Sequence, residues 1–554
     1  MVKGIKNLSY IAGGGKGLLS YTVGDMLRIA ASKWGQQDGL VSVHEGVTWS
    51  YSELLQRSES IAKGLVSLGL PKQARVGIYA PNCKEWLLAQ MATSLADLIL
   101  VSINPASQAF ELEYAINKVD VSALIMTPGF KNSNYIDLLT KIDPSMHNRM
   151  STTLDLPNLP SLKHIIIIGN KEESGTIPFH DLYHMESSEY KDRTRSVGFN
   201  DPTNILFTSG SRERPKAATL SHFNIVNNGH YVADTLKYTY RDRVAIPVPL
   251  YHCFGMVVGN LACITHGATI VYPDFSFSAA STIGAVSKEK CTSLYGVPTM
   301  YRALIKEQEK EKKDLSSLRT GVVLGSICPP DLMKKIVNVL GINGITSCYG
   351  MTETSPVSFQ TRLNDDLDKR VSTVGTIHPH VECQIINSKG EIVERGVVGE
   401  VCIRGYSVMK GYWGDEKATN DSITHDKWML TEDQGVLDDK GYLKIVGHLK
   451  DIIVRGGENI YPSEVEIFLG THPDIEEVHV FGVSDEFYGE QVAAWAKMKS
   501  GKKPLTLKEV QEFCKGNIAY FKVPKVFKVV DSFPVTATGN VMKYRMREEH
   551  EASK

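Results

Sequence analysis

A loop rich in hydroxyl and basic side chains follows the apolar segment Asn204–Phe207 and precedes a segment with helical spacing. Its candidate phosphate-binding residues are Thr208, Ser209, Gly210, Ser211 and Lys216. Backbone N–H groups, hydroxyls and a lysine ammonium in a loop between a strand and a helix can bind phosphate oxygens. Taken alone, this composition is equally compatible with a surface turn.

Five polar motifs follow this loop along the chain. They are Ser347–Pro356 (SCYGMTETSP), Thr431–Asp433 (TED), Ile445–Asp451 (IVGHLKD), Arg455–Glu464 (RGGENIYPSE) and Pro534–Asn540 (PVTATGN). In this order and spacing the chain resembles the adenylate-forming superfamily, which includes acyl-CoA synthetases, firefly-type luciferases and peptide-synthetase adenylation domains. The resemblance extends over nearly the whole chain, from about residue 20 to residue 548.

Within this superfamily the chain is most similar to medium-chain acyl-CoA synthetases. The segments that carry this likeness are Ile99–Pro105, Ala218–Asn228, Pro249–Cys253 and Ile452–Pro462. The resemblance implies an α/β fold with a large N-terminal domain, residues 1–446, of parallel and mixed sheets flanked by helices plus a β-barrel-like subdomain. It also implies a small, mobile α+β C-terminal domain, residues 447–554, with Lys450 and Asp451 at the hinge.

The resemblance implies a reaction in two halves. ATP and a carboxylic acid, here a fatty acid, first form an acyl-adenylate and pyrophosphate, and the CoA thiol then displaces AMP. ATP, Mg²⁺ and CoA are therefore the expected cofactors and substrates. A hinged domain that presents two faces to one bound adenylate would serve both halves.

The first of the five motifs matches the family's nucleotide motif. Tyr349 offers an aromatic face and Gly350 a close backbone approach for adenine, and the hydroxyl of Thr352 is placed for the α-phosphate. Glu353 resembles the family's magnesium-binding glutamate. Asp433 resembles the aspartate that accepts hydrogen bonds from both ribose hydroxyls. The structural alternatives are an ordinary Tyr-Gly turn and an acidic residue at a helix start.

Three other segments are assigned by the same resemblance. His252 matches the wall of the acyl pocket near the reacting carboxylate, and a buried structural histidine is the alternative. Gly325 and Ser326 match a loop whose backbone lines the adenine and acyl pocket. A loop of the C-terminal domain that helps to form the family's pantetheine tunnel, on the CoA side, is matched in this chain by Arg455, Gly456, Gly457 and Glu458.

The phosphate loop departs from the family pattern. Most relatives have Thr-Ser-Gly-Thr-Thr-Gly-x-Pro-Lys-Gly, whereas this chain has TSGSRERPKA from Thr208 to Ala217. Glycine there permits positive φ and a close approach to phosphate, and Glu213 adds a like charge beside it. Arg212 and Arg214 offer partial compensation.

The departure with the largest expected effect is Asn540, which stands where the family has its adenylation lysine. Asparagine donates a hydrogen bond but carries no charge, and losing one preorganised donor of this kind costs about 10² to 10³ in rate. Lys543 lies slightly further along and is expected to point elsewhere. At the nucleotide, His448 replaces an arginine and Glu432 replaces the glycine of Thr-Gly-Asp.

Short apolar, β-branched runs are expected to position these motifs. They are Arg75–Tyr79, Leu98–Val101, Ala123–Met126 and His164–Ile168, and segments with helical spacing separate them. This alternation predicts mostly parallel sheets covered by helices. A helix is predicted from Trp49–Ser52 to Gly69, and a capping box at Thr506–Glu509 predicts another. Residues 127–200 are predicted to be rich in loops.

Length and composition exclude several classes of protein. The chain has 554 residues, 42% hydrophobic and 22% charged, which is typical of a globular protein with several domains. Its 61 Lys and Arg nearly balance its 62 Asp and Glu, so no nucleic-acid partner is expected. Nine cysteines without a C-x-x-C pair predict a reducing compartment and no structural zinc. No membrane-spanning helix is expected, because long apolar runs are interrupted by polar residues.

Two compartments, the mitochondrion and the cytoplasm, stay open. The first 24 residues contain Lys3, Lys6 and Lys16 and no acidic residue, as in a mitochondrial transit peptide, but they lack arginine and are rich in glycine. No secretory signal is expected, and Ala552–Lys554 does not match the peroxisomal Ser-Lys-Leu signal.

Two functional hypotheses follow. The first is an ATP-dependent CoA ligase for medium-chain fatty acids with impaired adenylation. The second is a catalytically inactive homologue that acts as a binding or structural subunit of a larger assembly, and Asn540 with the altered phosphate loop favours it. A luciferase-like oxidation would need the same adenylate and would be weakened by the same changes.

Overall fold

The computed structural model describes residues 8–148, 150–169, 173–208, 215–324, 328–448, 453–455, 458–460, 462–485, 488–515, 517–518, 520–535 and 541–553. The chain forms two compact units. The larger unit comprises residues 12–382 and 403–429, and the smaller unit comprises residues 1–11, 383–402 and 430–554. The domain boundary at residue 446 stays a prediction. The hinge residues Lys450 and Asp451 lie outside the described segments.

The first sheet of the larger unit has eight strands in the order β10-β9-β6-β4-β5-β11-β12-β22. Their bounds are Ile177–Pro178, His164–Ile167, Val121–Met126, Arg75–Tyr79, Ile99–Ser102, Pro202–Thr208, Lys216–Ser221 and Gly411–Tyr412. The strands from β10 to β11 are parallel, whereas β12 and β22 are antiparallel to their neighbours. The four apolar runs predicted as strands are confirmed as β4, β5, β6 and β9, with small differences at their ends.

The second sheet of the larger unit has nine strands in the order β19-β18-β17-β16-β15-β13-β14-β2-β3. Their bounds are Thr376–Ile377, Val357–Gln360, Gly344–Gly350, Thr320–Val323, Ser293–Gly296, Arg243–Ala245, Thr269–Tyr272, Asp38–Ser42 and Val47–Ser50. The strands from β17 to β2 are parallel, and the edge strands are antiparallel. Polar residues that follow the parallel strands therefore gather at one edge of the sheet.

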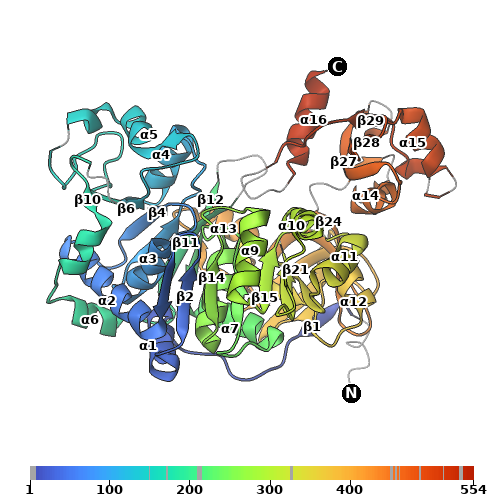
Figure 1. The fold of residues 1–554 in the computed structure, drawn as a ribbon. Coiled ribbons are helices and arrows are strands. Elements are labelled where there is room, and N and C mark those ends of the chain that lie inside the picture. Colours follow the sequence, from blue (N-terminus) through green and yellow to red (C-terminus); the bar gives the residue numbers. More distant parts are fainter. Residues whose placement is uncertain are drawn as a thin grey trace. The chain divides into compact units, whose positions relative to one another are not determined.

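One layer of helices lies between the two sheets (Figure 1). It contains α1 (Val23–Trp34), α2 (Tyr51–Ser67), α3 (Lys84–Leu95), α7 (His222–Leu236), α8 (Ala262–His266) and the π-helix Phe254–Leu261. A single core cluster joins side chains of these helices to strands of both sheets. Every residue of α3 from Trp86 to Leu95 is buried, as expected for a helix that is packed on all sides.

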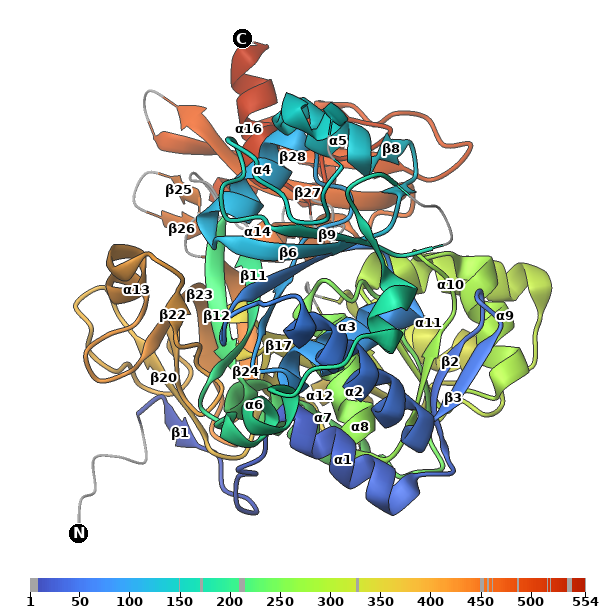
Figure 2. The same cartoon turned by 90° about the vertical axis from the view of Figure 1, so that its left-hand side faces the viewer.

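Two further helix layers cover the outer faces of the sheets. Figure 2 shows α4 (Ala109–Lys118) and α5 (Tyr135–Ile142) on the face of the eight-stranded sheet opposite α1–α3. The outer face of the nine-stranded sheet packs against α9 (Ala279–Glu289), α10 (Pro298–Glu311) and α11 (Pro330–Leu340). The larger unit also contains α6 (Tyr190–Ser196), α12 (Leu367–Ser372) and α13 (Glu416–Ser422).

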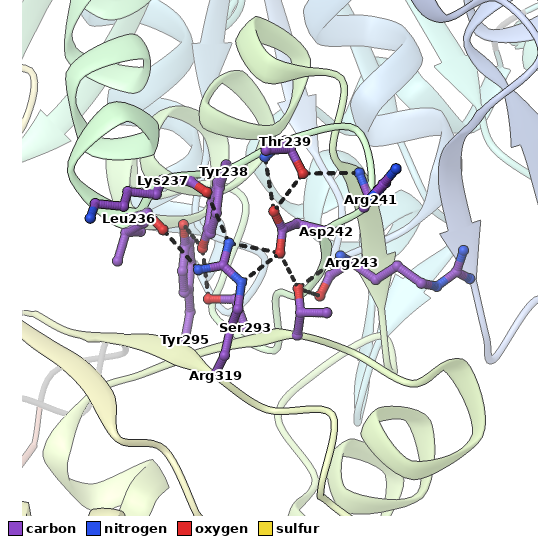
Figure 3. A network of polar contacts seen from close by, with 11 residues as sticks. Leu236, Lys237, Tyr238, Thr239, Arg241, Asp242, Arg243, Ser293, Tyr295 and Arg319 are labelled. Atoms are coloured by element: carbon purple, nitrogen blue, oxygen red, sulfur yellow. Dashed lines mark hydrogen bonds and ion pairs between the residues drawn. The ribbon is translucent and has the colours of Figure 1, made fainter. Parts of the chain in front are cut away.

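A network of polar contacts fixes the C-terminal end of α7 (Figure 3). The guanidinium of Arg319 donates from Nη1 to the carbonyl of Leu236 and from Nη2 to that of Lys237, both at 3.1 Å. Its Nε donates to Oδ1 of Asp242 at 2.9 Å. The arginine thus satisfies carbonyls that a helix end leaves without partners. Because Arg319 precedes β16 and Asp242 precedes β13, this network ties α7 to the nine-stranded sheet.

The smaller unit is built on two sheets. The five-stranded half-barrel sheet has the order β1-β20-β21-β23-β24, with bounds Tyr10–Ala12, Val381–Ile386, Gly399–Gly405, Met429–Leu437 and Leu443–His448. The other sheet has the order β26-β25-β28-β27, with β29 beside β28, and bounds Glu458–Ile460, Ile453–Arg455, Gly489–Met498, Ile475–Asp485 and Val526–Val529. Its helices are α14 (Pro462–Leu469), α15 (Leu507–Cys514) and α16 (Lys543–Ala552). The predicted α/β class with a smaller C-terminal part is confirmed.

Two local predictions of helices are confirmed, and one prediction of irregular structure is partly wrong. Ser50 caps α2 and Thr506 caps α15, both with capping boxes. Residues 127–200, predicted to be rich in loops, contain α5, α6, the short strands Gly129–Phe130 and Ser133–Asn134, and the 3₁₀ turns Pro144–Asn148 and Phe179–His184. Scattered apolar side chains of this segment are buried against β6 and β9 without following one periodicity. The periodicity of apolar residues alone therefore underestimates how much regular structure this segment contains.

Two features of the composition can be followed in the structure. All nine cysteines lie in described segments, and each is buried with a free thiol. Among the helices of the described segments, none has both the length and the apolar character needed to cross a membrane.

Candidate active site

Glu353 is a buried carboxylate in the 3₁₀ turn Thr352–Thr354, directly after the central strand β17. The hydroxyl of Tyr412 donates to its Oε1 at 2.8 Å. Burial raises the pKa of Glu353, and the hydrogen bonds from Tyr412 and Thr208 and the nearby charge of Lys216 oppose this rise. The carboxylate therefore lies in a desolvated site that already contains a hydroxyl donor and a cation.

The two described ends of the predicted phosphate loop converge on this carboxylate. Thr208 and Lys216 are opposite each other in the antiparallel pair β11–β12. The ammonium of Lys216 lies 5.1 Å from the centroid of the Tyr412 ring, within the range of a cation–π contact. The residues between them, Ser209, Gly210, Ser211, Arg212, Glu213 and Arg214, lie outside the described segments.

The segment predicted to line the acyl pocket contacts the turn Thr352–Thr354 through Cys253. Its buried thiol is hydrogen-bonded to Thr352, and burial together with the charge of Glu353 raises the pKa of the thiol. The neighbouring His252 accepts a hydrogen bond at Nδ1 from the backbone N–H of Phe254 at 3.2 Å. Desolvation lowers the pKa of His252 to about 4. The ring is therefore neutral near pH 7, with its proton on Nε2.

Tyr349 and Gly350 end strand β17. Tyr349, which is 9% exposed, is opposite Phe359 on β18. A Cβ atom at Gly350 would lie 1.7 Å from the carbonyl oxygen of Pro356, so the turn admits only glycine there. Ser355 has a φ of 72° and completes the reversal of the chain. The turn that presents Thr352 and Glu353 is therefore tightly packed.

The predicted ribose-binding residue lies in the smaller unit. Asp433 is opposite His448 in the β23–β24 pair, and its N–H donates to Oγ1 of Thr431 at 3.1 Å. Glu432 has a φ of 60°, and its N–H donates to Oε1 of Glu400 at 3.1 Å. Glu432, which replaces the glycine of the family pattern, thus has a left-handed backbone conformation that glycine adopts more easily than any other residue.

On the predicted CoA side, the structure describes the side chain of Arg455. Its Nε donates to Oε1 of Gln491 at 2.6 Å, and its guanidinium lies 4.1 Å from the ring centroid of Tyr488. Of His448 and Glu458 only the backbone is described. The predicted site residues that lie outside the described segments are Ser209, Gly210, Ser211, Gly325, Ser326, Lys450, Asp451, Gly456, Gly457 and Asn540.

The structure therefore brings Thr208, Lys216, Thr352 and Glu353 together within the larger unit. It adds Tyr412 and Cys253, which sequence reasoning did not assign to the site. Tyr412 belongs to a strand of two residues, and its pairing with β12 is long-range, so no local pattern signals its role.

Comparison with known proteins decides the family. The profile of the family described as AMP-binding enzyme matches residues 27–413, and that of the AMP-binding enzyme C-terminal domain matches residues 464–540. The chain belongs to the AMP-binding enzymes, the adenylate-forming superfamily. The resemblance seen in the motifs is thereby confirmed.

Several AMP-binding enzymes are similar over nearly the whole chain. "Medium-chain acyl-CoA ligase ACSF2, mitochondrial" from Danio rerio is 41% identical over 96% of this chain and 89% of its own length. The Homo sapiens protein of the same name is 39% identical over 99% of this chain and 90% of its own length. "Putative acyl-CoA synthetase YngI" from Bacillus subtilis is 40% identical, with 96% and 97% covered.

Solved structures of AMP-binding enzymes share the fold. ATP-bound MatB from Rhodopseudomonas palustris has a TM-score of 0.83 and 25% identity, with 95% of this chain and 99% of that chain covered. The anthranilate CoA ligase AuaEII in complex with anthranoyl-AMP has a TM-score of 0.84 and 22% identity, with 97% and 98% covered, and supports the fold alone.

The chemistry around Glu353 fits the magnesium ion that the AMP-binding family implies. In the part of the chain that the structure describes, no group of three or more His, Cys, Asp or Glu side chains is placed to hold a metal. Magnesium is usually held by one or two carboxylates together with substrate phosphates. The single buried carboxylate of Glu353 fits this pattern, and the lysine beside it is available to phosphate.

Proposed function

We propose that the protein is an ATP-dependent ligase that joins medium-chain fatty acids to CoA, with a slow adenylation step. The cluster of Glu353, Thr208, Lys216 and Tyr412 carries this proposal, because a buried carboxylate, hydroxyls and an ammonium suit a polyphosphate with its divalent cation. The relatives named medium-chain acyl-CoA ligase support the choice of substrate.

In the proposed reaction, Tyr349 and Gly350 contact adenine and Asp433 accepts the ribose hydroxyls. Thr352 and Lys216 bind phosphate oxygens. A bound Mg²⁺ would neutralise phosphate charge, with the carboxylate of Glu353 as its protein ligand. The serine and glycine residues of the phosphate loop, and the backbone of Gly325 and Ser326, complete the nucleotide site.

We assign the acid to the neighbourhood of His252. Its neutral ring, with the proton on Nε2, can donate a hydrogen bond to the reacting carboxyl group without holding it as an ion pair. The CoA thiol then approaches from the side of the loop Arg455–Glu458, after the C-terminal domain rotates about Lys450 and Asp451.

The slow step follows from Asn540. The family lysine at this position would stabilise charge as it shifts from the carboxylate to the α-phosphate, and an amide supplies only a dipole. Thioester formation from an existing adenylate depends less on that charge. Adenylation is therefore the half-reaction that limits turnover.

Acid-dependent release of AMP and pyrophosphate tests the proposal. The purified protein is mixed with ATP, Mg²⁺, CoA and a panel of fatty acids centred on octanoate. Asn540→Lys, combined with Thr-Gly at the positions of Arg212 and Glu213, should raise the rate of pyrophosphate release by about 10² to 10³. Asn540→Gln is the matched control, because it lengthens the side chain without adding a charge. It should leave the rate near that of the unchanged chain.

No acid-dependent release from the unchanged chain or from the restored variant would contradict a ligase. Stabilisation of the protein by AMP or acyl-CoA without turnover would then support the second candidate, a binding or structural subunit of a larger assembly. The residue that favours this candidate is Asn540. This candidate is tested by measuring the mass of the native complex that contains the protein in a cell extract. Tyr349→Ala should leave that mass unchanged if the role is purely structural.

We also propose a mitochondrial location, which the names of the relatives support. The full-length chain with a C-terminal fluorescent tag should then colocalise with a mitochondrial marker. A uniform cytoplasmic distribution would contradict this proposal.

A further inference from the structure

We infer that Tyr412 is a positioning residue of this site: its hydroxyl fixes the Glu353 carboxylate, and its ring holds the Lys216 ammonium apart from that carboxylate. The inference rests on the proposed nucleotide role of Glu353 and Lys216. In this proposal Tyr412 keeps the Glu353 carboxylate and the Lys216 ammonium from pairing with each other. The carboxylate can then bind the metal, and the ammonium can bind the polyphosphate.

The backbone of Tyr412 is held from two sides. It forms strand β22 with Gly411, and it is opposite Ala218 in the pair with β12. Its N–H donates to Oγ1 of Thr419 at 2.9 Å. The residue is 7% exposed, so its ring also has little space in which to move. The direction of the side chain is therefore set before any ligand binds.

The carboxylate of Glu353 depends on this direction. Glu353 lies in a turn of three residues, and its backbone carbonyl accepts a hydrogen bond from the N–H of Met409 at 2.9 Å. That contact fixes the main chain but not the side-chain torsions. The hydroxyl of Tyr412, 2.8 Å from Oε1, selects one orientation of the carboxylate. Hydrogen bonds to a buried charged group are among the stronger ones in proteins.

The ring of Tyr412 has a second contact. Lys216 lies on the same face of β12 as Ala218, which is opposite Tyr412, so Lys216 and Tyr412 are diagonal neighbours across the strand pair. The ammonium lies 5.1 Å from the ring centroid. Lys216 influences Glu353 through its charge, and among the described residues the contact of its ammonium is with the face of the Tyr412 ring. A direct pair would neutralise both groups where phosphate and metal need them.

Two variants separate the two contacts. Tyr412→Phe removes the hydroxyl and keeps the ring, whereas Tyr412→Leu removes both. Calorimetry on the full-length chain measures the binding of ATP with Mg²⁺, of ATP with a chelator, and of AMP with a chelator. Tyr412→Phe should weaken Mg²⁺-ATP binding about tenfold and change AMP binding by less than about twofold. Tyr412→Leu should in addition weaken the binding of metal-free ATP, because Lys216 is then free to pair with Glu353.

Tyr238→Phe is the matched control. Its buried hydroxyl is hydrogen-bonded to Ser293 and Tyr295 on β15, and its loss should leave Mg²⁺-ATP binding unchanged. Thermal unfolding of both Tyr412 variants alongside this control tests whether they fold. Tyr412→Phe decides the role of the hydroxyl, and its comparison with Tyr412→Leu decides the role of the ring.

Folded Tyr412 variants that bind Mg²⁺-ATP as tightly as the unchanged chain would overturn the inference and leave the proposed function standing. An unchanged chain that binds neither ATP nor AMP would overturn the proposed nucleotide site itself, and the inference with it.

Discussion

The side-chain amide of Asn228 lies against the peptide group of Val357, donating from Nδ2 to the carbonyl at 2.8 Å and accepting at Oδ1 from the N–H at 3.1 Å. Asn228 is on α7 and fully buried, and Val357 begins β18 directly after the turn that carries Glu353. Asn227 makes the same two-fold contact with the backbone of Leu19. Helix α7 therefore supports two separate segments of the larger unit through neighbouring amides.

Replacing Asn228 by alanine should lower the free energy of unfolding by about 2 to 4 kcal/mol, because two buried backbone groups lose their partners. Urea denaturation measures this loss. AMP binding should weaken as well, since the turn after β17 loses its support.

Asn227→Ala is the matched control for this prediction. It removes the same chemical contacts from Leu19 and should destabilise the protein while leaving AMP affinity of the folded protein near its original value. Equal losses of AMP affinity in both variants would contradict a specific role for the Asn228–Val357 contact.

Glu432→Gly should raise the free energy of unfolding by about 1 kcal/mol. Glu432 has a φ of 60°, which costs a residue with a Cβ atom about 1 kcal/mol and costs glycine little. The hydrogen bond from its N–H to Glu400 involves the backbone and is kept in the variant. Thermal or urea unfolding measures the gain.

Glu432→Ala distinguishes backbone strain from charge. It removes the charge of the side chain and keeps the Cβ atom, so it should not reproduce the gain. If alanine stabilises the protein as much as glycine does, the loss of the Glu432 side chain rather than the left-handed backbone is the cause.

The stability of the protein should fall as the pH is lowered from 6.5 toward 4, partly because of His222. This residue begins α7, is 1% exposed and accepts a hydrogen bond at Nδ1 from the N–H of Val23. Burial lowers its pKa to about 4. The unfolded chain takes up the proton near pH 6.5 and the folded chain only near pH 4, so the unfolded chain binds more protons between these values.

The contribution of His222 is therefore complete above pH 6.5 and is lost progressively below it, by at most about 1.4 kcal/mol per pH unit. Urea denaturation between pH 4.5 and 7 measures how steeply the free energy of unfolding changes with pH. In His222→Gln this slope should be smaller than in the unchanged chain, by the equivalent of about one proton. His425→Gln, at a fully exposed side chain, should leave the slope unchanged. Identical slopes in the unchanged chain and in His222→Gln would refute this assignment.

Much of the fold could be predicted from the sequence, because strands such as β4 and helices such as α2 carry strong local signals: an apolar β-branched run in one case, a capping box in the other. Glu353 and Thr352 could be proposed as site residues because their motif is continuous. Tyr412 could not, because its role comes from a long-range pairing with β12. Asn228 is hidden for the same reason, since a polar residue inside a helix has no local partner that reveals its function.

Lys543 should not replace the cation that is missing at Asn540. Its Nζ lies 2.7 Å from Oε1 of Glu466, and both side chains are largely buried, at 17% and 21% exposed. The same oxygen accepts the N–H of Val480 at 2.8 Å, which fixes the carboxylate on α14. Lys543 begins α16, so this ion pair attaches the last helix to the rest of the smaller unit.

Lys543→Ala should therefore lower the free energy of unfolding by about 1 kcal/mol, because a partly buried carboxylate loses its cation. Acid-dependent pyrophosphate release by the folded protein should change by less than about twofold. Glu466→Gln removes the same ion pair from its other side and should give the same pair of results. A Lys543→Ala variant that loses adenylation while Glu466→Gln keeps it would show the opposite, namely that Lys543 leaves Glu466 during turnover and supplies the positive charge that Asn540 lacks.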